Sequence, residues 1–246
     1  MRVLGVVPAR LGSTRLPHKP LQLLAGEPLV TRVIQRVLSF DAVDELVVAT
    51  DSPMVAEVAE RSGVRAVLTR DTHLSGTERV AEVAARPEFA EFELIANVQG
   101  DEPFLPPAAL TGALARVRGG DDVGTAAAPL DPADADDPAR VKVVLDAHDH
   151  ALYFSRAAIP YRRADATAEA GYWQHLGLYV CTRTALERWV AAPPAPAEAL
   201  EMLEQLRALH WGMRIGVTRL AEPAPPGIDT PDDLRRAERH WHHSHG

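Results

Sequence analysis

The stretch VLGVVPARLGSTRLPHKP, residues 3–20, decides the fold. It begins with a short apolar, mostly β-branched run, Val3 to Val7, which is typical of a strand buried on both faces of a parallel sheet. A loop follows directly and carries three bases, Arg10, Arg15 and Lys19. Ligands of open α/β sheets bind beyond the carboxyl ends of the strands. The stretch therefore predicts a buried parallel sheet with a basic loop at its carboxyl edge.

Strand-like and helical patterns alternate through the first hundred residues. Apolar runs like the first recur at Glu45 to Ala49, Ala66 to Thr69 and Leu94 to Val98. Between them, helical spacing after a Pro or Ser/Thr start is found at Pro28 to Phe40, Pro53 to Ser62 and Thr77 to Ala85. This alternation predicts βαβ units with right-handed crossovers, and hence an α/β fold.

The middle of the chain has a different pattern, with strand-like segments in succession: Gly124 to Pro129, Val141 to Leu145, Leu152 to Ser155 and Leu176 to Cys181. Such a run predicts an antiparallel-containing insertion that covers one side of the site. Ala164 to Gly171 is a low-complexity loop to which we assign no chemistry. Further on, Ala197 to Leu209 and Pro231 to Trp241 are expected to be helices that flank a strand, Arg214 to Arg219.

The composition is that of an ordinary globular protein, with 46% apolar and 24% charged residues in 246 positions. Such a chain can bury a full core as one domain, with room for a modest insertion. No apolar run reaches the roughly 18 residues of a membrane helix, and the first strand begins where a signal peptide would lie. The single cysteine, Cys181, excludes an internal disulfide and a thiolate zinc cluster, and we expect it to be a small buried residue. We expect a cytoplasmic protein without a membrane partner.

The distribution of charge points to a small polyanion rather than to nucleic acid. The net charge is −8, whereas binding along a phosphate polymer needs a basic face. Residues 1–26 contain no acid, and they hold 4 of the 26 bases, which leaves 22 bases against all 34 acids in the rest. A local positive site in an acidic protein attracts a small anion.

The basic loop has the groups that a triphosphate needs. A small, Gly-containing turn exposes backbone N–H groups, and Arg10, Arg15 and Lys19 add charge-assisted donors. A solvated basic loop is the simpler alternative, but three bases within ten residues of one another directly after a strand favour a triphosphate cradle. Neither a Walker pattern nor the Rossmann G-x-G-x-x-G is present, which argues against P-loop and NAD-binding proteins.

Two carboxylates are candidates for a Mg²⁺ site. Asp101 follows Gly100 at the end of the fourth strand, where the sheet edge would place a hard oxygen ligand. An acidic turn residue is an equally good interpretation of that segment alone. Asp229 precedes Thr230, Pro231 and Asp233, which make a good helix start without it. A second carboxylate brought to the first would complete a metal site for phosphoryl chemistry.

Other polar residues leave their roles open. Ser75 to Arg79 suits a helix cap and a contact to a base or ribose equally well. Glu201, Glu204 and Gln205 share a helical face that is either solvated or directed at a polyhydroxylated ligand. His175 alone indicates a structural histidine. The His-rich end of the chain, from His240, receives no role.

Taken together, these blocks resemble the 3-deoxy-manno-octulosonate (Kdo) cytidylyltransferase family. The resemblance runs through nearly the whole chain: PARLGSTRLPHKPL (8–21), VATD (48–51), SGTER (75–79), NVQGDEP (97–103), VKVVLD (141–146), ALYFSRAAIP (151–160), HLGLY (175–179), EMLEQLR (201–207) and IDTPDDL (228–234). The first and fourth blocks alone indicate only a sugar-nucleotide type of nucleotidyltransferase. SRAAIP, HLGLY and EMLEQLR, in this order, narrow the resemblance to this family.

The resemblance implies a Rossmann-like α/β nucleotidyltransferase fold, a mostly parallel central sheet and a smaller β-containing lobe for sugar binding and dimerisation. We expect one nucleotidyltransferase domain, with residues 1–130 and 205–240 as nucleotide and metal core and residues 131–204 as the sugar-acid lobe. The expected partners are CTP and Kdo, with Mg²⁺ as cofactor, in a homodimer.

The resemblance also implies roles for individual residues. The catalytic set is Arg10, Lys19, Asp101 and Asp229, of which Asp101 and Asp229 bind the metal. The nucleotide is expected to contact Pro8, Ala9, Arg10, Leu11, Arg15, Lys19, Ala49, Thr50, Asp51, Ser75, Gly76, Gln99 and Gly100. The sugar acid is expected to contact Gln99, Arg156, His175, Tyr179, Glu204 and Gln205, with Arg156 facing its carboxylate on charge grounds.

The implied reaction is in-line attack of the sugar's anomeric hydroxyl on the α-phosphorus of CTP, which releases pyrophosphate. Such chemistry depends on positioning and charge neutralisation. Departures from the family pattern include His18 in place of Gly, Leu74 in place of Gln, and changes at residues 161–163 and 180–181. Because the last two border the expected acceptor pocket, a cytidylyltransferase for another ulosonic acid or a phosphonate is the main alternative. A non-catalytic nucleotide-binding protein of the same fold is the other.

Overall fold

The computed structural model describes residues 1–13, 15–163 and 171–245, so most of the expected loop at Ala164 to Gly171 lies outside the described residues. The chain forms two compact units. Unit 1 comprises Met1–Pro107 and Pro225–Gly246, and unit 2 comprises Ala108–Ala224. The expected division into a nucleotide-binding core and a sugar-acid-binding lobe is defined by the ligands that each part binds, and it stays a prediction.

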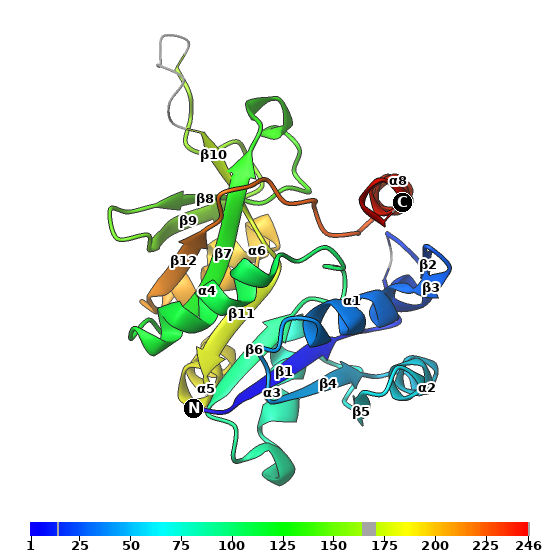
Figure 1. Ribbon diagram of the computed structural model, residues 1–246. Coiled ribbons are helices and arrows are strands. Elements are labelled where there is room, and N and C mark those ends of the chain that lie inside the picture. The colour runs from blue at the N-terminus through cyan, green and yellow to red at the C-terminus, as the bar shows by residue number, and fades with distance from the viewer. Residues whose placement is uncertain (14, 164–170, 246) are drawn as a thin grey trace. The chain divides into compact units, whose positions relative to one another are not determined.

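Unit 1 is built on a four-stranded parallel sheet (Figure 1). Its order is β5 (Arg65–Leu68), β4 (Glu45–Thr50), β1 (Val3–Pro8) and β6 (Leu94–Val98). Every residue of β1 and β6 is buried, as expected of central strands covered on both faces. The four strands predicted for the first hundred residues are confirmed, and parallel pairing brings their carboxyl ends to one edge.

The predicted helices of unit 1 are confirmed as α1 (Leu29–Leu38), α2 (Pro53–Arg61), α3 (Gly76–Ala84) and α8 (Pro231–His245). Ser52 caps α2 and Ser75 caps α3, each through a side-chain oxygen that accepts a backbone N–H. Short elements complete the unit: η1 (Lys19–Leu21), the hairpin of β2 (Leu23–Leu24) and β3 (Glu27–Pro28), and η2 (Pro87–Phe89).

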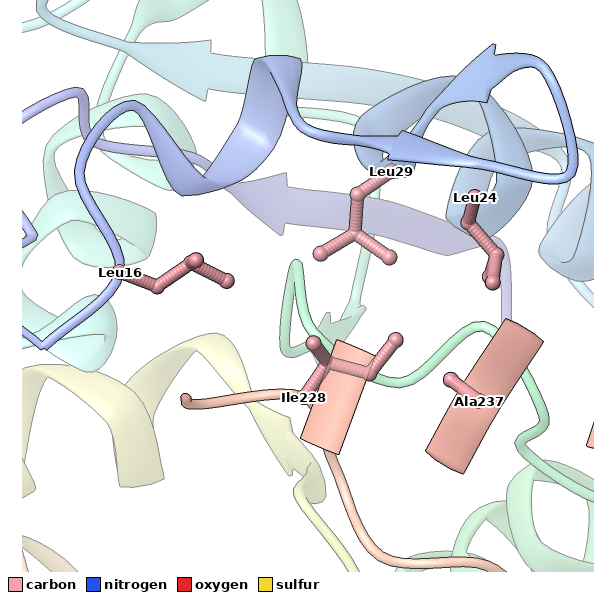
Figure 2. Packing of buried hydrophobic residues seen from close by; sticks show 5 residues of the cluster. All are labelled: Leu16, Leu24, Leu29, Ile228 and Ala237. Atoms are coloured by element: carbon pink, nitrogen blue, oxygen red, sulfur yellow. The ribbon is translucent and has the colours of Figure 1, made fainter. Parts of the chain in front are cut away.

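A small apolar cluster joins the two ends of the chain within unit 1 (Figure 2). Leu16, Leu24 and Leu29 from the N-terminal segment pack with Ile228 and Ala237 from the C-terminal segment, and all five are buried. A fully buried leucine or isoleucine stabilises the fold by roughly 1.5–3 kcal/mol. The cluster therefore holds the segment before α8 against the basic loop, although the two are far apart in sequence.

Unit 2 is built around β7 (Val123–Leu130). One side of β7 pairs in parallel with β12 (Ile215–Arg219). The other side pairs antiparallel with β11 (Leu178–Thr182) at its start and with β10 (Tyr172–His175) at its end. Beyond β10 lie β8 (Lys142–Leu145) and β9 (Ala151–Ser155), both antiparallel. The expected antiparallel insertion is confirmed.

The helices of this part of the chain are α4 (Pro107–Arg118), α5 (Arg183–Ala191), α6 (Pro196–Glu201) and α7 (Gln205–His210), with a short η3 (Pro132–Asp134). The sequence pattern did not predict α4, α5 or β10. The single helix expected from Ala197 to Leu209 is wrong, because Met202 takes a left-handed backbone with φ 53° and separates α6 from α7.

Within the described parts of the chain, no helix combines the length and apolar character needed to cross a membrane.

Candidate active site

Three expected site residues meet at the carboxyl edge of the unit 1 sheet. Lys19 lies at the start of η1, Asp101 follows β6, and Asp229 precedes α8. The Lys19 Nζ atom lies 2.5 Å from Asp101 Oδ2 and 2.8 Å from Asp229 Oδ1. Arg15 adds a second cation, with an Nη atom 3.0 Å from Asp229 Oδ2. Two carboxylates from distant segments thus share one ammonium group.

The electrostatics of this cluster favour the charged forms. Burial alone would lower the pKa of Lys19, but the carboxylates of Asp101 and Asp229 outweigh it, so this pKa is raised. Burial would likewise raise the pKa of Asp229, but Lys19 and Arg15 outweigh it, and this pKa is lowered. The group is an ion network at neutral pH.

Local hydrogen bonds hold the backbone of Asp229 in place, and its side chain does not cap helix α8. The Asp233 carboxylate accepts from the Asp229 and Thr230 amides at 3.1 and 2.8 Å, and Thr230 Oγ accepts from the Asp233 amide at 3.2 Å. The predicted helix start at Thr230 is therefore confirmed. The Ile228 amide donates to the Asp101 carbonyl at 3.0 Å, which ties the two carboxylate-bearing segments together.

Glycines allow close approach around the end of β1. A Cβ at Gly100 would lie 2.8 Å from the Pro8 carbonyl oxygen, and a Cβ at Gly76 would lie 3.0 Å from Gln99 Oε1 and 3.2 Å from Pro8 Cγ. Because real Cβ atoms do not approach backbone so closely, Gly100 is required by the fold there. Pro8, Gln99, Gly76 and the beginning of α3 are thereby brought together, as the expected nucleotide contacts require.

Ser75 was expected to cap a helix or to contact the base or ribose, and the structure confirms the helix cap. Its Oγ accepts from the Glu78 amide at 3.2 Å, while Glu78 accepts from the Leu74 amide at 2.9 Å. The contact of Ser75 to a base or ribose stays a prediction.

The VATD segment, residues 48–51, accepts hydrogen bonds from the backbone of the basic loop. The Ala49 carbonyl accepts from the Ala9 amide at 2.8 Å, and Asp51 accepts from the Leu11 amide at 3.4 Å. Asp51 also pairs at 3.0 Å with Arg79, whose side chain is buried. Ala49 and Thr50 are fully buried. Ala49 and Asp51 therefore position the loop, and Arg79, to which the sequence interpretation gave no role of its own, holds Asp51.

The cations of the loop differ in their freedom. Arg10 is exposed and makes no hydrogen bond or ion pair with any described residue, whereas Lys19 and Arg15 are held by carboxylates. His18 has φ 53°, in the left-handed region that favours glycine. The glycine that the family resemblance implies at this position would adopt this backbone without strain.

The expected acceptor residues all lie in unit 2, apart from Gln99. His175 and Tyr179 are buried, with ring centroids 5.4 Å apart, and Thr125 Oγ lies 2.9 Å from His175 Nε2. Burial lowers the pKa of His175 to about 3, so the ring is neutral at physiological pH. Gln205 is buried at the start of α7, and the carbonyl of Glu204 accepts from the Trp189 indole at 3.2 Å.

Arg156 sits at the end of β9 and is held by backbone carbonyls. Its guanidinium donates to Glu201 at 2.8 Å, Pro138 at 2.9 Å and Met202 at 3.4 Å. Its own amide donates to the Glu201 carboxylate at 2.9 Å. The Lys142 ammonium donates to the Arg156 carbonyl at 2.6 Å, and neither Lys142 nor Glu201 was part of the predicted pocket. A lysine inside the apolar VKVVLD strand was the sequence signal for Lys142.

Cys181 is buried in β11, as expected. Burial raises the pKa of its thiol to about 12, so this cysteine is an inert packing residue.

A parallel α/β sheet with a basic loop and paired carboxylates at its carboxyl edge defines a nucleotidyltransferase. Comparison with known proteins refines this class. A family model described as cytidylyltransferase matches residues 4–215. The chain belongs to the 3-deoxy-manno-octulosonate cytidylyltransferase family, which confirms the resemblance seen in the motifs.

The similarity extends over nearly the full length of the relatives. The 3-deoxy-manno-octulosonate cytidylyltransferase of Gemmatimonas aurantiaca is 54% identical over 98% of this chain and 95% of its own. That of Methylococcus capsulatus is 47% identical over 96% and 95%. A solved structure of CMP:2-keto-3-deoxy-manno-octonic acid synthetase complexed with CTP has a TM-score of 0.90 and 36% identity, covering 99% of this chain and 100% of that one.

Proposed function

We propose that this enzyme transfers CMP from CTP to the anomeric hydroxyl of Kdo, giving CMP-Kdo and pyrophosphate. The observation that carries the proposal is the convergence of Lys19, Asp101 and Asp229 beside the end of β1. The named activity of the relatives and the CTP in the related structure support the choice of substrates.

The triphosphate would be held by the basic loop. Exposed Arg10 and Arg15 supply charge-assisted donors, and the carboxylates hold Lys19 in one position before substrate arrives. Ser75 and Gln99, at the beginning of α3 and the end of β6, are proposed to seat the nucleoside.

Asp101 and Asp229 fit a Mg²⁺ ion. Both offer hard oxygen ligands, and both lie within 2.8 Å of the same Lys19 nitrogen, so they are close enough to share a cation. Proteins typically bind Mg²⁺ through one or two carboxylates and leave the other positions to water and substrate phosphates. When bound there, the ion would neutralise charge on the transferring phosphate.

The acceptor acid is proposed to bind Arg156. A guanidinium has five N–H donors, and three of those of Arg156 are used by backbone carbonyls. One N–H on each Nη atom remains, which suits a carboxylate. His175, whose ring is neutral, completes the proposed pocket together with Tyr179, Glu204 and Gln205.

In the proposed step, the anomeric oxygen forms a bond to the α-phosphorus while the bond from that phosphorus to the bridging oxygen of the β-phosphate breaks. The hydroxyl proton passes to solvent, and pyrophosphate leaves. Lys19 and the arginines of the loop hold the triphosphate in line for attack, and the reaction needs no covalent nucleophile.

A pyrophosphate-release assay tests the proposal. The enzyme is given CTP or UTP with Kdo, sialic acid or a small phosphonate, in the presence of Mg²⁺. Release with CTP and Kdo alone is expected. Release with another acid but not with Kdo would show that this other acid is the acceptor. No release with any pair would support the alternative of a non-catalytic nucleotide-binding protein.

The remaining parts of the proposal concern place and assembly. We propose a cytoplasmic enzyme, because a single cysteine that cannot form an internal disulfide fits a reducing compartment. We also propose a homodimer, as the family resemblance implies. Light scattering on the purified protein should give twice the chain mass of 26.7 kDa.

A further inference from the structure

A buried polar row crosses three strands of unit 2. Gln174 on β10 stands opposite Lys142 on β8, and Lys142 stands opposite Ser155 on β9. Directly opposite residues on neighbouring strands point to the same face of a sheet. The exposed fractions are 4%, 0% and 3%, respectively, so this face carries a continuous line of polar groups out of contact with water.

Lys142 is the unusual member of this row. Its ammonium donates to the carbonyls of Asp137 at 2.9 Å and Arg156 at 2.6 Å, and among the described residues no carboxylate lies within ion-pair distance of it. A fully buried cation without a direct counter-ion is expensive. Burial lowers the pKa of Lys142, while Asp137 and Asp136 oppose that shift from a distance. A leucine or methionine would fill the same space at lower electrostatic cost.

Lys142, Ser155 and Glu201 are all linked to Arg156 by hydrogen bonds, directly or through one another. Lys142 binds the Arg156 carbonyl, and Glu201 accepts from the Arg156 amide at 2.9 Å and from Ser155 Oγ at 2.6 Å. Lys142 also fixes the turn at Asp137, whose neighbour Pro138 accepts from the Arg156 guanidinium. The backbone and the side chain of Arg156 are therefore both aligned by one network of hydrogen bonds, in which Lys142 and Ser155 are buried.

We propose that Lys142 is a positioning residue for the acceptor acid. By holding the Arg156 carbonyl and the 137–138 turn, it directs the two remaining N–H groups of the guanidinium toward the acceptor carboxylate. It touches neither substrate. This inference rests on the proposed function, and it assigns to Lys142, with Ser155 and Glu201, the task of keeping Arg156 in its binding geometry.

The test measures KM for Kdo and for CTP separately, by pyrophosphate release. Lys142→Met is expected to raise KM for Kdo roughly tenfold or more, because misplaced binding groups lose most of their effect. KM for CTP should stay within about twofold. In the Arg156→Met background, Lys142→Met should add little, because it acts through Arg156.

Arg116→Met is the matched control. It breaks a partly buried ion pair of unit 2, between Arg116 Nε and Asp121 Oδ2 at 2.8 Å, outside this network. It should lower the melting temperature and leave both KM values unchanged. If Lys142→Met fails to fold, Glu201→Gln replaces it, since this change keeps the side-chain shape and weakens the acceptor of the Arg156 amide.

The outcomes separate the two proposals. Release with CTP and Kdo by the unmodified enzyme, together with an unchanged KM for Kdo in folded Lys142→Met or Glu201→Gln, overturns this inference alone. Additive effects of Lys142→Met and Arg156→Met overturn it as well. No release by the unmodified enzyme overturns the proposed function, and this inference with it.

Discussion

At the scale of single residues, Lys19 is the centre of the candidate active site. It bonds to carboxylates 82 and 210 positions away in the sequence, and it lies within the loop that also carries Arg10 and Arg15. Preorganised charges of this kind stabilise charge that develops in a transition state without further reorganisation. Asp101 and Asp229 hold Lys19, and the proposed function gives them a second task, to bind Mg²⁺.

Removing either carboxylate should abolish most of the turnover. We expect Asp101→Ala or Asp229→Ala to reduce kcat by about 100- to 1,000-fold or more, because the proposed mechanism relies on charge neutralisation at the phosphates. Far-ultraviolet circular dichroism should stay unchanged. Asp232→Ala, which removes an exposed carboxylate three residues from Asp229, is the control and should retain full activity. Near-normal pyrophosphate release from either variant would show that its carboxylate is not a metal ligand.

The ion network also predicts a pH dependence of stability. The pKa of Asp229 is lowered in the folded state, so its stabilisation is present above the unfolded pKa near 4 and is lost as the pH falls through the folded pKa. The raised pKa of Lys19 contributes below about pH 10 for as long as the two carboxylates that raise it are ionised. Urea denaturation should therefore show that Lys19→Met destabilises the protein at pH 7 and progressively less below pH 4. An equal difference at both pH values would contradict the network.

At the scale of elements, the break between α6 and α7 decides where the EMLEQLR residues lie. A continuous helix would place Glu201, Glu204 and Gln205 on one face. The left-handed residue Met202 redirects the chain, so that Glu201 faces Ser155 and Arg156 while Gln205 starts a new helix. The Arg156 guanidinium binds the carbonyls of Glu201 and Met202, which the end of α6 leaves without helical partners.

A glycine at this break should be tolerated. The Met202 side chain is 77% exposed, and its left-handed backbone costs free energy that a glycine would not lose. Met202→Gly is therefore expected to be neutral or to stabilise the protein by up to about 1 kcal/mol. The matched change Leu200→Gly, at an 86% exposed position within α6, should destabilise by about 1 kcal/mol. Urea denaturation measures both free energies of unfolding. Equal destabilisation by the two would mean that the chain does not break at Met202.

At the scale of the whole molecule, the chain returns to its first unit before it ends. Residues from Pro225 onward belong to unit 1, and the apolar cluster of Leu16, Leu24, Leu29, Ile228 and Ala237 fastens them there (Figure 2). Asp229 directly follows a buried member of that cluster. The second carboxylate of the site is thus supplied by the packing of two distant chain ends.

Weakening this packing should destabilise unit 1. Ile228 is 1% exposed, so Ile228→Ala is expected to cost about 2–5 kcal/mol, the range for truncating a buried large aliphatic side chain. Met54→Ala, at a position that is 52% exposed in the same unit, should change the stability by less than about 0.5 kcal/mol. Thermal unfolding followed by circular dichroism makes the comparison. A small effect of Ile228→Ala would contradict tight packing of the segment before α8.

Local sequence predicted the elements that carry a strong local signal. The β-branched runs of β1, β4 and β6 and the capped starts of α2, α3 and α8 were found within a residue or two, because burial on both faces and side-chain capping leave direct marks in sequence. Helix α4 was missed because its Ala-rich pattern has no sharp apolar stripe. The break at Met202 was missed because its carbonyls are satisfied by Arg156, from another part of the chain.

The basic loop, the candidate carboxylates and the family motifs follow from the sequence by itself, since residue type and order determine which groups are available. Only the tertiary structure decided that Asp101 and Asp229 both bind Lys19 and that Asp51 accepts a hydrogen bond from the loop. The same holds for the hydrogen bond from Lys142 to the Arg156 carbonyl. The physical reason is that these contacts join segments separated by many residues. Strand register, parallel pairing and the packing of the chain ends bring these segments together. A local sequence pattern contains no information about such long-range contacts.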